Sequence, residues 1–204
     1  YDDHHHLTSR TDGSGVTTRY EYTTDGKVSA VVTVTGRTTY AYDSTARSTT
    51  VTDATGATTT YYFDDKGRNV RTVDALGGET AYTYNDQGLL TAKATAAETT
   101  RYEYDEQRRL VKTTDPLGRV RTVTYDPTFG KELEVVDFSG ARTTYTLDSQ
   151  GQVATQTDAL GNTVTFTRNK KGLVTAATDP AGRMARSEYD AFGRAITRID
   201  PAGN

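Results

Sequence analysis

Apolar and aromatic positions along the chain follow a short repeat of about 21 residues, from one end to the other. Each repeat centres on an anchor position that is usually tyrosine. Self-similarity at such a short, fixed period is typical of stacked supersecondary units, so we expect residues 1–204 to form about ten tandem repeats without a separate second domain. The clearest anchors are Tyr22, Tyr42, Phe63, Tyr84, Tyr104, Tyr125 and Tyr189, and the remaining ones are Tyr1, Leu147 and Arg168.

The stretches between turns have the composition of short β-strands. Segments such as Arg68 to Val73 and Gly78 to Tyr84 are rich in Thr, Val and Tyr and contain no proline. Residues of this kind favour strands, and no segment shows a capped helical period. The connections are too short for parallel crossovers. We therefore predict an all-β fold of about twenty strands that form a continuous antiparallel meander.

Two turns per repeat separate these strands. An aspartate or asparagine leads each turn and a glycine usually closes it, because the leading side chain bonds its own backbone and glycine tolerates a positive φ. We expect Gly67, Gly88, Gly118 and Gly193 to have positive φ. The candidate turn glycines are Gly26, Gly67, Gly77, Gly88, Gly118, Gly151, Gly161, Gly172, Gly182 and Gly193, and the candidate leading aspartates are Asp64, Asp74, Asp115, Asp158, Asp179 and Asp190.

The odd period constrains the turns. A three-residue hairpin loop would place Tyr22 opposite Val28, Tyr84 opposite Leu90 and Tyr104 opposite Leu110, all even separations. Because side chains alternate along a strand, two such turns per repeat would send successive anchors to opposite faces. We therefore expect one turn per repeat to have a two-residue loop. Thr33, Thr95 and the segment Asp126 to Gly130 mark the repeats of unusual length.

Composition does not favour a large central core. Hydrophobic residues make up 34% of the chain, tryptophan is absent, and the mean hydropathy is -0.70. This supply fits one half-buried stripe per strand. A sheet of this length with the usual right-handed twist is expected to curl into a spiral strip.

Charge and cysteine content exclude several classes of partner. The net charge is -3, with 24 basic and 27 acidic residues interleaved, so neither nucleic acid nor a membrane is an expected partner. The chain has no cysteine, which excludes disulfides and thiolate metal sites. No apolar run is long enough for a membrane span. We expect no cofactor.

Candidate catalytic groups are few. The histidines His4, His5 and His6 form one run, but consecutive strand residues point to opposite faces, so a solvated turn is favoured over a metal site. Paired carboxylates such as Asp64 and Asp65 recur as turn formers rather than as a glycosidase pair. The 14 tyrosines favour cross-strand packing, with aromatic platforms for a sugar as the alternative.

The anchor and turn sequences are similar to those of a known family. Tyr102-Glu103-Tyr104-Asp105, Glu188 to Arg194 and Thr114 to Gly118 resemble the RHS/YD repeats. The resemblance implies a β-sheet strip wound into a hollow cocoon, which in bacterial toxins encloses a C-terminal toxin domain and in teneurins serves adhesion. No active-site residue carries over from this family.

The resemblance suggests a structural role in a larger protein. We expect a shell segment of a secreted or surface bacterial protein that encloses or displays a C-terminal polypeptide, with the rest of the shell, that polypeptide and a delivery component as partners. The alternative is an adhesion module whose outward tyrosine rows bind carbohydrate or a receptor. A β-propeller would need alternation at twice the period, which the sequence does not show.

Overall fold

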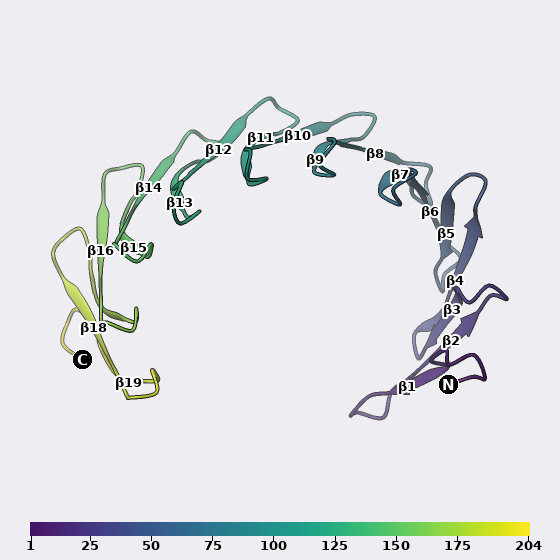
Figure 1. Ribbon diagram of the computed structural model, residues 1–204, viewed down its shortest axis with the longest axis horizontal. Helices are drawn as coiled ribbons and strands as arrows, with labels where there is room; N and C mark the ends of the chain where they lie inside the picture. Colours follow the sequence, from purple (N-terminus) through teal and green to yellow (C-terminus); the bar gives the residue numbers. More distant parts are fainter. The chain divides into compact units, whose positions relative to one another are not determined.

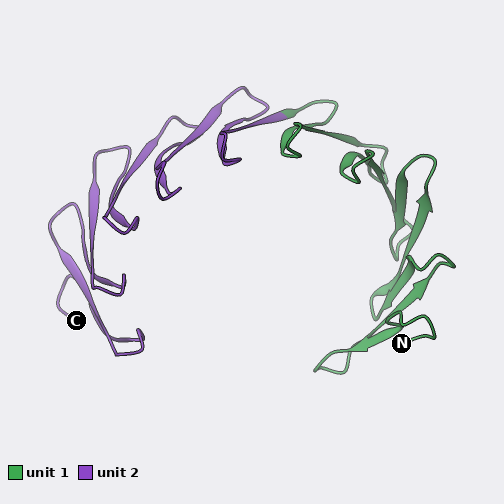
Figure 2. Cartoon of the chain, in the orientation of Figure 1, with its two compact units in different colours: residues 1–99 green, residues 100–204 purple.

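The structure of the protein is a computed structural model that describes residues 1–204. It contains 19 strands and no helix, which confirms the predicted all-β fold. The chain divides into two compact units, Tyr1–Thr99 and Thr100–Asn204, coloured green and purple in Figure 2. Both units are built from the same repeats. The chain forms no helix that is both long enough and apolar enough to span a membrane.

The strands of the two units are short and follow one another in sequence (Figure 1). Unit 1 contains β1 (Ser9–Thr11), β2 (Thr17–Tyr22), β3 (Val28–Thr33), β4 (Gly36–Asp43), β5 (Ser48–Thr52), β6 (Thr58–Phe63), β7 (Asn69–Val73), β8 (Glu79–Tyr84) and β9 (Leu90–Ala94). Unit 2 contains β11 (Leu110–Thr114), β12 (Val120–Tyr125), β13 (Glu132–Val136), β14 (Arg142–Leu147), β15 (Val153–Thr157), β16 (Thr163–Arg168), β17 (Val174–Thr178), β18 (Met184–Tyr189) and β19 (Ala195–Ile199), preceded by β10 (Thr99–Tyr104), which begins at the unit boundary.

Within each unit, every strand pairs antiparallel with the next strand along the chain, as predicted for a meander. The expected register is also confirmed. Tyr22 lies opposite Val28, Tyr84 opposite Leu90, and Tyr104 opposite Leu110. These pairs fix where each anchor lies relative to the turn that follows it.

Both turns of a regular repeat have the same geometry. In the turn led by Asp64, the Asp64 N–H donates to the carbonyl of Arg68 and the Gly67 N–H donates to the carbonyl of Asp64. The turn led by Asp74 has the same two bonds, with Gly78 and Gly77 in the equivalent positions. Each is a three-residue loop closed by a glycine bulge. The prediction that one turn per repeat has a two-residue loop is therefore wrong for the regular repeats.

A β-bulge after the anchor keeps the anchors on one face instead. Tyr84 pairs with Leu90 whereas Thr83 pairs with Ala92, so Thr91 has no partner opposite it. The register shifts at the same place in eight of the nine hairpins that carry an anchor. One extra residue in a strand reverses the alternation beyond it. Two turns that each join positions an even number of residues apart, together with one bulged residue, thus give an odd period. Successive anchors then stay on the same face of the sheet.

The irregular repeats differ in loop length at the places expected from sequence. A two-residue loop joins Thr33 to Gly36, and the Thr95 N–H donates to the carbonyl of Glu98 across another. The turn led by Asp126 is one residue longer than the regular turns. The hairpin of β4 and β5 has no bulge, and its extra residue lies in a longer loop that brings Arg47 to a φ of 49°.

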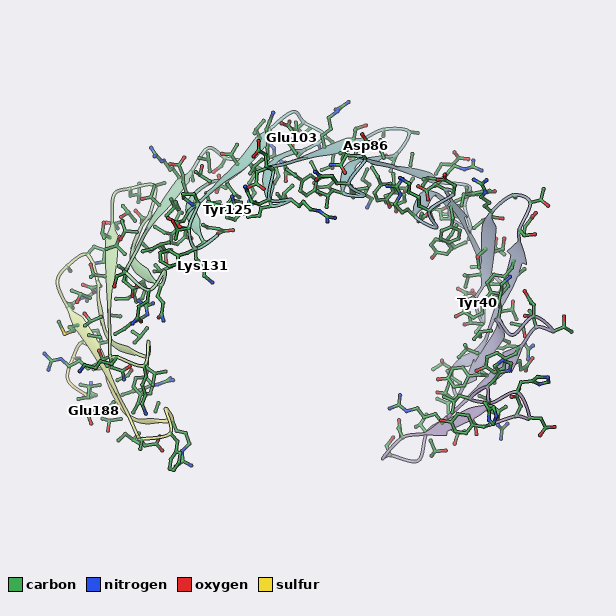
Figure 3. The ribbon with its side chains drawn as sticks, in the orientation of Figure 1. Tyr40, Asp86, Glu103, Tyr125, Lys131 and Glu188 are labelled. Atoms are coloured by element: carbon green, nitrogen blue, oxygen red, sulfur yellow. The ribbon has the colours of Figure 1, made fainter.

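The sheet has two faces and no central core. Only Ala30 and Val123 are buried among the hydrophobic residues, with 0% and 4% exposure. Side chains along β8 alternate between half-buried and exposed, with Tyr82 and Tyr84 on the half-buried face. In Figure 3, Tyr125 lies towards the inner side of the bend of unit 2 and Glu103 towards its outer side. This half-buried stripe matches the expectation from composition.

Glycines at the turns adopt the backbone conformation expected of them. Gly67, Gly88, Gly118 and Gly193 have φ values of 75°, 80°, 77° and 84°. Arg108 takes the place of the closing glycine in the turn led by Asp105 and has a φ of 66°. The left-handed conformation is thus a property of the turn, and glycine is the residue that adopts it at the lowest cost.

Replacing Gly67 with valine is expected to destabilise the protein by about 1 to 2 kcal/mol, because a β-branched residue is strained at positive φ. A Cβ at Gly67 would meet no atom within 4 Å, so steric overlap does not contribute. Urea denaturation of Gly67→Val measures the loss. Gly13→Val is the matched control, because Gly13 lacks positive φ and also has open space. Equal losses in the two variants would contradict the turn assignment.

Candidate functional site

The leading aspartate organises the turn that follows each anchor. The Asp64 Oδ1 accepts hydrogen bonds from the backbone N–H groups of Lys66 and Arg68, both at 2.9 Å. The N–H of Arg68, together with its guanidinium, lowers the pKa of Asp64. The carboxylate therefore stays charged near neutral pH and acts as a fixed acceptor at the hairpin end.

The second oxygen of the same carboxylate connects the turn to the next repeat. The Asp64 Oδ2 accepts from Nε of Arg68 at 2.7 Å and lies 2.6 Å from its Nη2. The Arg68 guanidinium lies 4.8 Å from the centre of the Tyr84 ring, and the Tyr84 hydroxyl donates to the carbonyl of Asn69 at 2.8 Å. We call this set of Asp, basic residue and next anchor the repeat joint. It links a turn and the strand that follows it to the anchor of the next repeat.

The joint recurs in unit 2. Arg109 bonds Asp105 through Nε at 2.7 Å, its guanidinium lies 4.6 Å from the Tyr125 ring, and the Tyr125 hydroxyl donates to the carbonyl of Leu110. Burial raises the pKa of Tyr125, so its hydroxyl stays protonated and remains a donor. The anchors Tyr22, Tyr42 and Tyr189 make the same kind of hydroxyl bond, to the carbonyls of Leu7, Val28 and Val174.

Arg168 replaces the tyrosine at one anchor and keeps its bond. Its Nη1 donates to the carbonyl of Val153, at the same sequence offset as the tyrosine bonds. The preceding turn carries Gln152 where other joints have a basic residue. The pKa of Asp148 is lowered chiefly by the backbone N–H of Gln152, with a smaller contribution from the charge of Arg168. The cation of this joint thus comes from the anchor position.

The residue after the turn glycine changes with the residue that leads the turn. Where asparagine leads, as at Asn85 and Asn169, the residue after the glycine is Leu89 or Leu173. The asparagine still accepts the two backbone bonds, as in the 2.9 Å bond from the Leu89 N–H. An asparagine leader therefore goes with leucine at this place, whereas the neutral leader Thr23 goes with Lys27, which pairs with Asp25 inside the turn. This pairing follows from the cost of leaving a half-buried charge without a partner.

Burial separates the joints from the pairs at the second turns. In the joints, the Arg68 and Arg109 side chains are 27% and 25% exposed. Arg183 makes the same kind of pair with Asp179 at a second turn but is 70% exposed. Ion pairs as exposed as this one contribute little to stability. The aromatic anchor of the next repeat is what distinguishes the joint.

The opposite face of the sheet carries exposed cross-strand ion pairs. Lys112 pairs with Glu103 at 2.8 Å, and Arg71 pairs with Glu79 at 2.9 Å while its guanidinium lies 4.0 Å from the Tyr62 ring. Such pairs keep a single-layer sheet soluble on its polar side and add a few tenths of a kcal/mol or more each. Each pair joins opposite charges on neighbouring strands.

The histidines lie in a turn, as expected from sequence. The Asp2 N–H donates to the carbonyl of His6, and His5 has a φ of 64° at the position that glycine occupies elsewhere. His6 occupies the place of Arg68 in the joint. His, Cys, Asp and Glu side chains nowhere form a group of three or more that could hold a metal ion.

Several turn aspartates have a lowered pKa. A backbone N–H donor is the main cause of a lowered pKa at Asp148, Asp179, Asp190 and Asp200. A general acid at neutral pH requires the opposite shift. The arrangement of these carboxylates fits hydrogen-bond acceptors in turns.

The turns and anchors follow from the sequence, but the connection between them does not. The cation–ring contact was missed because it joins residues 16 positions apart, as Arg68 and Tyr84 are. The constant offset between basic residue and next anchor was the available signal.

The family model of the RHS repeat matches residues 1–38, 63–99, 84–120, 148–184 and 168–204. These ranges cover well over half of the chain. The chain belongs to the RHS repeat family. The regular repeats with their joints are thus RHS repeats, and the predicted family is confirmed.

Solved structures similar to these RHS repeats include the crystal structure of TcdB2-TccC3 without its hypervariable C-terminal region, at 14% identity and a TM-score of 0.40 over 95% of this chain and 15% of that chain. The Photorhabdus luminescens Tc holotoxin pore with a mutation in TccC3 has 13% identity and a TM-score of 0.35, over 92% of this chain and 16% of that chain. A porin-like protein from Bacteroides uniformis has 17% identity and a TM-score of 0.37, over 80% of this chain and 86% of that chain. The chain therefore spans less than a fifth of the two Tc toxin chains. Among curated proteins, none gives a significant match.

Replacing Tyr84 with phenylalanine is expected to destabilise the protein by about 0.5 to 1.5 kcal/mol, because the Asn69 carbonyl loses its donor. The ring and its contact with Arg68 remain. Tyr82→Phe is the matched control, since Tyr82 lies two residues earlier on the same face of β8 and does not make this bond. Urea denaturation compares the two variants. A loss of the same size in both would show that the hydroxyl bond of the joint is not what stabilises the repeat.

Proposed function

We propose that this chain is a non-enzymatic segment of the wall of a larger secreted or cell-surface RHS protein, and that the wall encloses or displays a C-terminal polypeptide. The single observation that carries the proposal is the repeat joint, which recurs along the chain in a member of the RHS repeat family. A repeated contact between neighbours builds area and extends a sheet. A catalytic centre needs one constellation of groups that occurs once.

The use of the polar side chains supports this proposal. The leading aspartates accept backbone N–H bonds, and the anchor hydroxyls donate to backbone carbonyls. These groups are therefore committed to holding turns and neighbouring repeats. The lack of large fully buried side chains and the two-faced sheet are also consistent with a thin wall rather than a globular domain.

The alternative is an adhesion module that binds carbohydrate through rows of tyrosines. Sugar binding by aromatic side chains requires exposed ring faces. The ring of Tyr84 instead contacts Arg68, and that of Tyr125 contacts Arg109. Among the anchors after Tyr1, Tyr42 is the most exposed, at 39%, and is the place where this alternative is best tested.

The wall function predicts protection from protease. In the full-length RHS protein that carries these repeats, we expect the polypeptide after the shell to resist limited proteolysis while the shell is intact. The double variant Arg68→Ala and Arg109→Ala removes the cation from two joints and is expected to increase its cleavage rate several-fold. Arg183→Ala, at an exposed second turn, is the matched control and is expected to leave the rate unchanged.

Two results would overturn the proposal. One is equally fast cleavage of the C-terminal polypeptide with and without an intact shell. The other is tight binding of the 204-residue chain to a glycan array that is lost in Tyr42→Ala, which would favour the adhesion module. Proteolysis and glycan binding are measured separately, so the two functions can be told apart.

A further inference from the structure

His6 occupies the position of Arg68 and Arg109 in the first repeat joint. Its Nδ1 lies 3.0 Å from Oδ2 of Asp2, and its backbone N–H donates to Oδ1 of the same carboxylate at 2.8 Å. Its ring stacks on Tyr22, with 4.5 Å between ring centres and an angle of 20° between the planes. The Tyr22 hydroxyl donates to the carbonyl of Leu7 at 2.8 Å. The carboxylate and ring contacts of the arginine joints, and the hydroxyl bond of the anchor, therefore have counterparts here.

Arginine and histidine side chains differ in the pH range over which they are charged. Arginine is charged at every physiological pH, whereas histidine gains or loses its charge between about pH 5 and 8. The ion pair with the aspartate and the attraction of a cation to the tyrosine ring both require the charged form. A neutral imidazole keeps the ring contact and one hydrogen bond but loses both charge-dependent contributions.

We propose that the contact of Asp2, His6 and Tyr22 is a pH-sensitive joint, which holds the first repeat to the second more tightly when His6 is protonated. The ion pair with Asp2 and the attraction of the cation to the Tyr22 ring are present at acidic pH, where histidine is charged, and are lost as the pH rises through neutrality. The arginine joints keep their strength over the same range, so the effect is confined to this end of unit 1.

Asp2 is the acidic group that pairs with His6, because the other acidic side chains nearby pair with basic residues. The His4 ring stacks at 5.8 Å on the same side of the turn, where its own protonation adds a repulsive charge. On the neighbouring strand and turn, Glu21 bonds Arg37 at 2.7 Å and Asp25 lies 2.8 Å from Lys27, so both acids already have a basic partner. The His6 ring lies in a surface hollow of 320 Å³, whose titratable lining residues are Asp2, His4, Tyr20, Glu21 and Tyr22.

Hydrogen exchange of the Tyr20 amide reports on this joint, because its N–H donates to the carbonyl of Thr8 at 2.9 Å and so ties β2 to the first repeat. Exchange is followed by NMR on the 204-residue chain at pH 5.5 and 7.5, with correction for the intrinsic exchange rate. We expect protection of this amide to be about three- to tenfold higher at the lower pH. The Tyr82 amide, beside the Arg68 joint, is the internal reference and is expected to show no such change.

Three variants make the test specific. His6→Arg is expected to give high protection of the Tyr20 amide at both pH values, and His6→Gln low protection at both. His4→Gln is the matched control and should retain the pH dependence, because it leaves Asp2 and Tyr22 in place. Equal protection at the two pH values in the unmodified chain, or a pH dependence that persists in His6→Gln, would overturn the proposal. Loss of the pH dependence in His4→Gln alone would also overturn it, by assigning the effect to His4.

Discussion

Strict alternation of side chains along a β-strand is the constraint on which the rest of this structure depends. A period of 21 residues is odd, and both regular turns join positions an even distance apart. Without correction, successive anchors would lie on opposite faces. The bulge after the anchor of each regular repeat, such as the one at Thr91, supplies the missing residue. Within each unit the anchors therefore lie on one face, and Tyr84 and Tyr125 come within reach of the basic residue of the preceding turn.

The repeat joint depends on this correction and replaces the core that the composition cannot supply. Arg68 is held by Asp64 on one side and covered by the Tyr84 ring on the other. A cation over an aromatic ring contributes about 0.5 to 2 kcal/mol, and a hydrogen bond to the backbone about 1 kcal/mol. Each contribution is modest, but such joints recur along the chain, as at Arg68 and Arg109. Stability of such an array is approximately a sum over repeats and their interfaces.

Much of the fold was predictable from sequence, because turn residues and strand composition are local signals. The anchors, the turn-closing glycines and the register of Tyr84 with Leu90 all follow from rules about short segments. The bulge was not predictable in the same way. No residue type marks the bulged position, which is Ser29 in one hairpin, Thr91 in another and Ile196 in a third. The joint was missed because its contact lies between repeats rather than within one.

The most direct test of the coupling between repeats is a double-mutant cycle on one joint. The free energy of unfolding is measured for the unmodified chain, Arg68→Gln, Tyr84→Leu and the double variant. If the joint couples neighbouring repeats, the two losses are non-additive, with a coupling energy of about 0.5 to 2 kcal/mol between Arg68 and Tyr84. Losses that add to within about 0.3 kcal/mol would contradict the coupling and leave the joint as two independent contacts.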